Sequence, residues 1–294
     1  GAVRRRDLGE REVFLDLGDP SPIRGLPDGI DAVVHSAAVL ATSRFSRETM
    51  VINADGTRRM LDWARGAGVR HFIQISSIGA YGSQCVGEDR REDTGLCWFP
   101  LMPAYLRSKA QAERHILAAG VPYTILRLPA VFGAGDTVVT PAVVPALLRG
   151  AFPRISTRDP RVSTLWVRNA AEAVAAVLEH GPTHDAFNLT DGETRWSDFV
   201  ATFAAALQRE VVWGKQRALT LLTRSEDNEN MYLVTTGHFG AHFPADKLLA
   251  ALPGLVFADW RDGVREAVAA YRVVHGDAPV RGGLAGQRGS ASST

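Results

Sequence analysis

The chain has 294 residues, of which 46% are apolar and 22% charged, and its formal net charge is +1. This composition is that of an ordinary globular protein with one large domain, or a domain with a smaller appendage. The small net charge argues against nucleic acid or an acidic membrane as the main partner. Cys85 and Cys97 show no disulfide framework and no metal-ligand spacing, and the first residues form no apolar targeting segment. We therefore expect a cytoplasmic protein that binds no metal and acts on a small molecule. Whether the protein is a homodimer stays open.

Short β-rich runs alternate with helical patterns through the first two-thirds of the chain. Strands are predicted at about 12–15, Asp31–His35, Phe72–Ile75 and Tyr123–Leu128. Helices are predicted at Ser46–Ala67 and Ala104–Ala119, each ending near a glycine, and further on at about 141–149, 169–180, 196–207 and 262–273. Alternation of this kind indicates an α/β fold with a doubly wound parallel sheet covered on both faces.

The sequence also suggests how these elements divide into domains. We assign residues 1–135 to a nucleotide-binding core, to which residues 160–190 contribute. Residues 136–159 and 191–274 are assigned to a smaller substrate-binding region. The Gly-, Ser- and Arg-rich stretch 275–294 has too little apolar content to pack, and we expect it to be disordered.

A tyrosine and a lysine with helical spacing are the first sign of chemistry. Tyr105 and Lys109 are four residues apart and share one face of a predicted helix. A tyrosine hydroxyl has a reference pKa of about 10, and a nearby ammonium lowers that pKa by stabilising the phenolate. Ser76 and Ser77 follow the strand that ends at Ile75, on the edge where parallel sheets bind ligands. Taken alone, the Tyr-Lys spacing also fits an ordinary surface pair.

Other segments, in a fixed order, place this pair in context. They are Asp31–Ala38, Asn53–Thr57, Ser76–Gly82, Leu126–Asp136, Trp166–Ala173 and Phe187–Gly192. With Tyr105–Lys109, this series resembles the extended short-chain dehydrogenase/reductase superfamily, in its NAD-dependent epimerase/dehydratase and 3β-hydroxysteroid-dehydrogenase-like branch. The resemblance covers about residues 1–273 and implies a Rossmann-like fold.

The resemblance also implies roles for individual residues. Tyr105 is the expected general acid/base, Lys109 tunes it and holds the nicotinamide ribose, and Ser77, with Ser76 as the weaker candidate, orients the reacting oxygen. Expected cofactor contacts, besides Lys109, are Arg4, Asp16, Leu17, Ala37, Ala38, Pro129 and Val131. Expected substrate contacts are Tyr81, Trp98 and Phe132, whose aromatic rings suit an apolar or ring-bearing substrate. For Asn53, a structural role that bonds helix backbone is at least as well supported as a functional one.

The family's opening strand, glycine-rich turn and helix, which hold the pyrophosphate, have no counterpart at the start of this sequence. Three explanations stay open: the sequence lacks an N-terminal part of the natural protein, another chain supplies the unit, or cofactor binding has been lost. If the sequence is complete, the first strand of the sheet should be missing or replaced.

The predicted function is an NAD(P)-dependent oxidoreductase or epimerase/dehydratase acting on a carbinol or ketone carbon. NADP is favoured over NAD because arginines at positions 4–6 suit a 2′-phosphate, and no cofactor is expected if the opening unit is truly absent. The alternatives are a non-redox cyclase, isomerase or lyase on the same scaffold, and a non-catalytic sensor or binding module.

Overall fold

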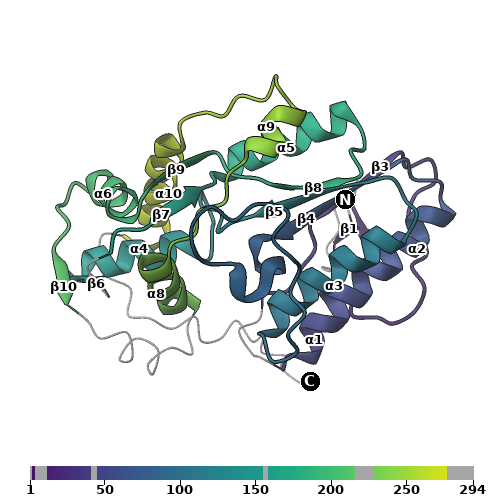
Figure 1. Cartoon of the computed structure of the whole chain (residues 1–294), viewed down its shortest axis with the longest axis horizontal. Coiled ribbons are helices and arrows are strands. Elements are labelled where there is room, and N and C mark those ends of the chain that lie inside the picture. Colours follow the sequence, from purple (N-terminus) through teal and green to yellow (C-terminus); the bar gives the residue numbers. More distant parts are fainter. Residues whose placement is uncertain (1, 4–11, 41–44, 155–157, 216–227, 277–294) are drawn as a thin grey trace, which may run out of the picture.

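A computed structural model describes residues 2–3, 12–40, 45–154, 158–215 and 228–276. Its centre is a four-stranded sheet, parallel throughout, in the order β3-β4-β5-β8. These strands are Ala32–His35, His71–Ser77, Tyr123–Leu128 and Asp185–Asn188. Figure 1 shows helices on both sides of the sheet, which confirms the predicted doubly wound α/β fold.

Two apolar cores hold the helices against the sheet. On one face, α2 (Gly56–Gly66) and α3 (Ala104–Ala118) pack Met60 and Ile116 around Phe72. On the other face, α5 (Val167–His180) and α9 (Asp246–Ala251) pack around Ile73. Successive side chains of a strand point to opposite faces, so the neighbours Phe72 and Ile73 serve different cores. Both are fully buried, as expected for a strand that is covered on both sides.

The predicted helix Ser46–Ala67 consists of three parts. The short helix α1 (Arg47–Met50) is followed by a π-helical turn, η1 (Val51–Asp55), and then by α2. The Ser46 hydroxyl oxygen accepts a hydrogen bond from the Thr49 amide at 3.2 Å and begins the helix. The π turn contains Asn53, and such turns are frequent at functional sites. Hydrophobic periodicity does not reveal a single wide turn of this kind.

The outer edge of β3 is open in the part of the chain that the structure describes. β1 (Ala2–Val3) and β2 (Val13–Phe14) form a separate parallel pair, and β3 is paired only with β4. A cavity of about 550 Å³ lies along β3 and is also lined by Val13 of β2 and by Leu15 and Leu17, which follow β2. Val34 of β3 is accordingly 41% exposed.

The smaller region is built from helices around an aromatic core. It contains α4 (Val139–Leu148), α6 (Trp196–Ala206), α8 (Asn228–Phe239) and α10 (Trp260–His275). Two short strand pairs accompany them: β6 (Phe152–Arg154) with β10 (Trp213–Lys215), and β7 (Arg161–Thr164) with β9 (Gly192–Arg195). The rings of Phe199, Phe203 and Trp260 surround Phe132 at centroid distances of 5.9, 6.2 and 6.5 Å. The helices predicted here begin within two residues of the observed ones, whereas α8 and α9 were not predicted.

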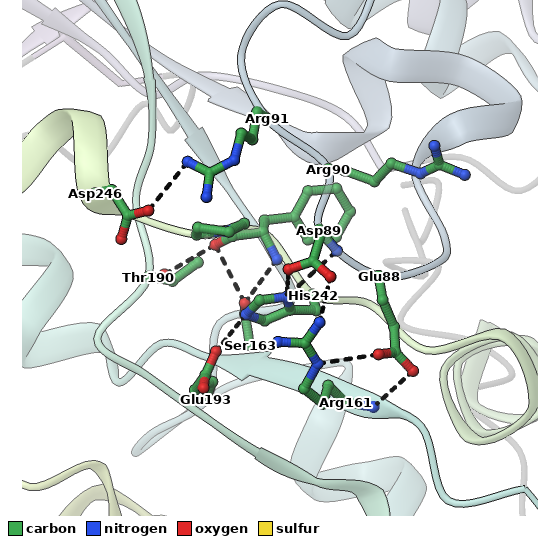
Figure 2. A network of polar contacts seen from close by, with 12 residues as sticks. Glu88, Asp89, Arg90, Arg91, Arg161, Ser163, Thr190, Glu193, His242 and Asp246 are labelled. Atoms are coloured by element: carbon green, nitrogen blue, oxygen red, sulfur yellow. Dashed lines mark hydrogen bonds and ion pairs between the residues drawn. The ribbon is translucent and has the colours of Figure 1, made fainter.

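A polar cluster fastens the segment after β4 to this region (Figure 2). His242 is buried, with Nδ1 3.2 Å from Asp89 Oδ1 and Nε2 2.5 Å from Glu193 Oε2. Arg161 of β7 donates to Glu88 at 3.0 Å and also to Asp89. Side chains from four segments that are distant in sequence are thus joined.

No helix in the described residues is long and apolar enough to cross a membrane.

Candidate active site

The serine candidates lie inside β4, not after it. β4 extends to Ser77 because Ser76 and Ser77 pair in register with Arg127 and Leu128 of β5. The Ser77 hydroxyl accepts the Gly79 amide at 3.0 Å and begins the 3-10 helix η2 (Ile78–Gln84). The strand was predicted to end at Ile75, two residues too early, because polar side chains obscured its continuation.

Glycine at position 79 lets this turn approach α3 closely. A Cβ atom there would lie 2.8 Å from Leu106 Cδ2, 3.2 Å from Ser77 Oγ and 3.4 Å from Tyr105 Cε1. The first of these distances is a clash, so a larger residue would require the Leu106 side chain or η2 to move. Gly79 therefore helps to bring Ser77 and Tyr105 together.

Tyr105 and Lys109 occupy successive turns of α3, as predicted. Burial raises the pKa of Tyr105, and a hydrogen bond between its side chain and Ser77 opposes this. Lys109 is buried, and its Nζ donates to the Ile75 carbonyl at 3.0 Å and lies 5.9 Å from the centre of the Tyr105 ring. Burial lowers the pKa of Lys109 to about 8. The structure thus brings Ser77, Tyr105 and Lys109 into one group.

Ser77 and Tyr105 open into a cavity of about 470 Å³. Its lining is mainly apolar: Leu40, Ile78, Pro129, Val131, Phe132, Val138 and Val167. Among the described lining residues the one charged side chain is Asp136. Its carboxylate accepts the Val138, Val139 and Thr140 amides at 3.1, 2.8 and 3.0 Å at the start of α4, so it serves as a helix cap.

The expected cofactor residues follow β2, β3 and β5. Pro129 and Val131 line the cavity that holds Ser77, and Leu17 and Ala37 line the one beside β3. Asp16 lines a third cavity of about 480 Å³ and accepts the Gly18 amide at 2.8 Å. Five of the expected cofactor residues, Asp16, Leu17, Ala37, Pro129 and Val131, therefore line cavities. Ala38 is exposed after β3, and Arg4 lies outside the described residues.

Of the expected substrate residues, only Phe132 reaches the cavity wall. Tyr81 is 2% exposed, donates to Asn188 Oδ1 at 2.7 Å and accepts from Arg127 at 3.1 Å, so both functions of its hydroxyl are already used. Trp98 is 82% exposed and contacts Phe99 edge-on, and it is not among the residues that line the cavity. The sequence could not separate these aromatic residues because it does not show which way each side chain points.

The Asn53 side chain connects segments instead of bonding within its own helix. Its amide donates to the Val39 carbonyl and the Ser108 hydroxyl at 3.0 Å each, and its carbonyl oxygen accepts the Val39 amide at 2.7 Å. It thereby joins the segment after β3 to α3. A structural role was anticipated, but its partners in other segments were not.

Comparison with known proteins identifies the family. The sequence profile of the NAD dependent epimerase/dehydratase family matches residues 2–190. The chain belongs to this family, within the extended short-chain dehydrogenase/reductases and their 3β-hydroxysteroid-dehydrogenase-like branch.

Two curated proteins illustrate its similarity to known sequences. A 3beta-hydroxysteroid dehydrogenase/Delta(5)-Delta(4) isomerase 1 from Caenorhabditis elegans is 38% identical over 156 residues, covering 50% of this chain and 33% of that protein. A ceramide reductase from Caulobacter vibrioides is 31% identical over 171 residues, covering 58% and 48%. The matched part thus spans less than half the length of either relative.

Solved structures support the fold. The UDP-glucuronic acid 4-epimerase from Bacillus cereus in complex with NAD has a TM-score of 0.69 at 16% identity, and covers 91% of this chain and 83% of that one. At this identity the likeness shows the fold alone.

Proposed function

We propose that this protein is an NAD(P)-dependent oxidoreductase or epimerase that acts on a carbinol or ketone carbon. The observation that carries the proposal is the convergence of Ser77 and Tyr105 on one apolar cavity, with Lys109 buried behind them. The names of the curated relatives, a dehydrogenase and a reductase, support the same chemistry. A bound nicotinamide would supply or accept the hydride.

Each side chain has a distinct task in this reaction. In reduction, the substrate carbonyl carbon gains hydride and the carbonyl oxygen takes the hydroxyl proton of Tyr105. In oxidation, the substrate hydroxyl returns that proton to Tyr105. Ser77 orients the same oxygen by a hydrogen bond. The Lys109 ammonium stabilises the tyrosinate left behind, because an adjacent positive charge favours the ionised form. Asp16, Pro129 and Val131 are the residues proposed to hold the two ends of the dinucleotide.

The cavity favours an uncharged, apolar substrate. A nucleotide sugar carries a diphosphate that needs cationic partners, and the described lining residues include none. Leu40, Phe132 and Val167 instead present apolar surface next to Tyr105. The printed names of the relatives, which refer to a steroid and a ceramide, support a lipid-like substrate.

Isotope transfer tests this proposal directly. The full-length natural protein is incubated with nicotinamide cofactor carrying deuterium at C4 of the reduced ring, in the NADH and the NADPH form, together with a 3-oxosteroid, a long-chain ketone or a UDP-4-ketohexose. We expect deuterium on the carbinol carbon of an apolar product, with NADPH preferred because of the arginines at positions 4–6. Transfer to the sugar alone would contradict the apolar substrate, and transfer to none would favour non-redox chemistry.

A further inference from the structure

A buried carboxylate lies one turn beyond Lys109 on α3. Tyr105, Lys109 and Glu113 are spaced four residues apart and follow the same side of the helix. Glu113 is 1% exposed, and its Oε1 accepts the Ser76 hydroxyl at 2.5 Å. Arg127 donates to both carboxylate oxygens, with Nη2 2.7 Å from Oε2 and Nε 3.1 Å from each oxygen. A buried carboxylate needs such partners to remain charged.

Arg127 extends these contacts across the site. Its Nη1 donates to the Tyr81 hydroxyl at 3.1 Å and to the Glu92 carbonyl at 3.2 Å. The Tyr81 hydroxyl in turn donates to Asn188 of β8. One connected buried cluster therefore joins α3, β4, β5, η2 and β8.

The cluster lies directly next to the proposed catalytic residues. Ser76 precedes Ser77 in β4, and Lys109 is one turn before Glu113. Arg127 lies two residues before Pro129, which lines the cavity. The proposed chemistry does not use Glu113, Arg127 or Ser76, although all three are buried. A fully hydrogen-bonded polar cluster can fix helices and strands in one arrangement. At this location it would fix the elements that carry the proposed catalytic residues.

We propose that Glu113 is a positioning residue for Ser77, Tyr105 and Lys109. It holds α3 against the ends of β4 and β5 through Ser76 and Arg127, and it provides the buried negative charge that keeps the Lys109 ammonium protonated. This role rests on the proposed function. Burial lowers the pKa of Lys109, and the charge of Glu113 opposes that effect. Loss of the Glu113 charge therefore moves the pKa of Lys109 further down.

The other ionisable groups around Lys109 do not supply this negative charge. His35 of β3 is buried, and burial, together with the charge of Lys109, lowers its pKa to about 4, so it is neutral at pH 7. Tyr105 and Tyr81 both have a raised pKa because of burial and are also neutral. Arg127 lies beyond Glu113 and is paired with it. From η1 and α2, Asp55, Arg58 and Asp62 act on His115 further along α3.

Lysine NMR can test the proposal without relying on catalysis. The chain has three lysines, Lys109, Lys215 and Lys247, so a titration of 13C-labelled ε-carbons gives few signals. A Lys109→Met variant identifies the signal of interest. The main variant is Glu113→Gln/Arg127→Met, which removes both charges together, because removing one would leave the other buried and unpaired. Ser76→Ala is the matched control, since it breaks a hydrogen bond to Glu113 and keeps the charge.

We expect the Lys109 midpoint to fall below the wild-type value in the double variant and to stay unchanged in Ser76→Ala. An unchanged midpoint in a folded double variant would overturn the proposal. If the double variant does not fold, Glu113→Met/Arg127→Leu replaces the pair by apolar side chains and is read in the same way. Wild-type turnover is measured separately. A shifted midpoint in a protein without hydride transfer would refute the proposed function and leave the link between Glu113 and Lys109 intact.

Discussion

The two sides of the candidate site differ in how completely they are held. On the side of α3, β4 and β5, Lys109, Glu113 and Arg127 are all buried and each has a hydrogen-bond partner. On the side of β3, the outer strand edge is open in the described residues, and a cavity of about 550 Å³ lies along it. The buried side chains next to the proposed proton-transfer residue are thus held by contacts within the protein, whereas the side proposed for the adenine half has space for a ligand or a further segment.

The largest expected effect comes from breaking the buried ion pair. Arg127→Met leaves Glu113 buried without its main partner, which should lower the free energy of unfolding by about 3–5 kcal/mol. Arg70→Met is the matched control, because the pair of Arg70 with Asp31 is exposed on both sides and contributes about 0–1 kcal/mol. Urea unfolding measures both. Equal losses in the two variants would show that the α3–β5 side is not held as described.

The smallest effect is expected at the open edge. Val34→Thr on β3 keeps the side-chain shape at a position that is 41% exposed, so stability should change by no more than about 0.5 kcal/mol. Ile73→Val, which removes one methyl group from the closed core of β4, should cost about 0.5–1.5 kcal/mol. A larger loss for Val34→Thr would mean that the outer edge of β3 is covered in solution.

The sequence predicted the helices and strands whose formation depends on a local pattern of residues. Tyr123–Leu128 was placed to the residue, and Ala104–Ala118 to within one residue, because buried apolar runs and helix periodicity are local signals. The assignment of Ser77, Tyr105 and Lys109 to a common site came from motif order, and the structure places them together.

What the sequence could not show were contacts between distant segments. Glu113 is four residues after Lys109 and could have been noticed by its spacing, but its partners Ser76 and Arg127 come from separate strands. Tyr81 was predicted to contact substrate, yet its hydroxyl points to Asn188, more than a hundred positions further along the chain. Side-chain direction depends on tertiary packing, which periodicity does not record.

Turnover of a Tyr105→Phe variant tests the central claim most directly. The change removes one hydroxyl, so binding of cofactor should be retained while kcat falls by about 10²–10⁴-fold, the usual contribution of general acid–base catalysis. Tyr123→Phe is the control, because Tyr123 lies in the same fold at the opposite end of β5. Loss of kcat in Tyr105→Phe with wild-type kcat in Tyr123→Phe is the predicted result. Unchanged kcat in a folded Tyr105→Phe variant would contradict the assignment of Tyr105 as the general acid/base.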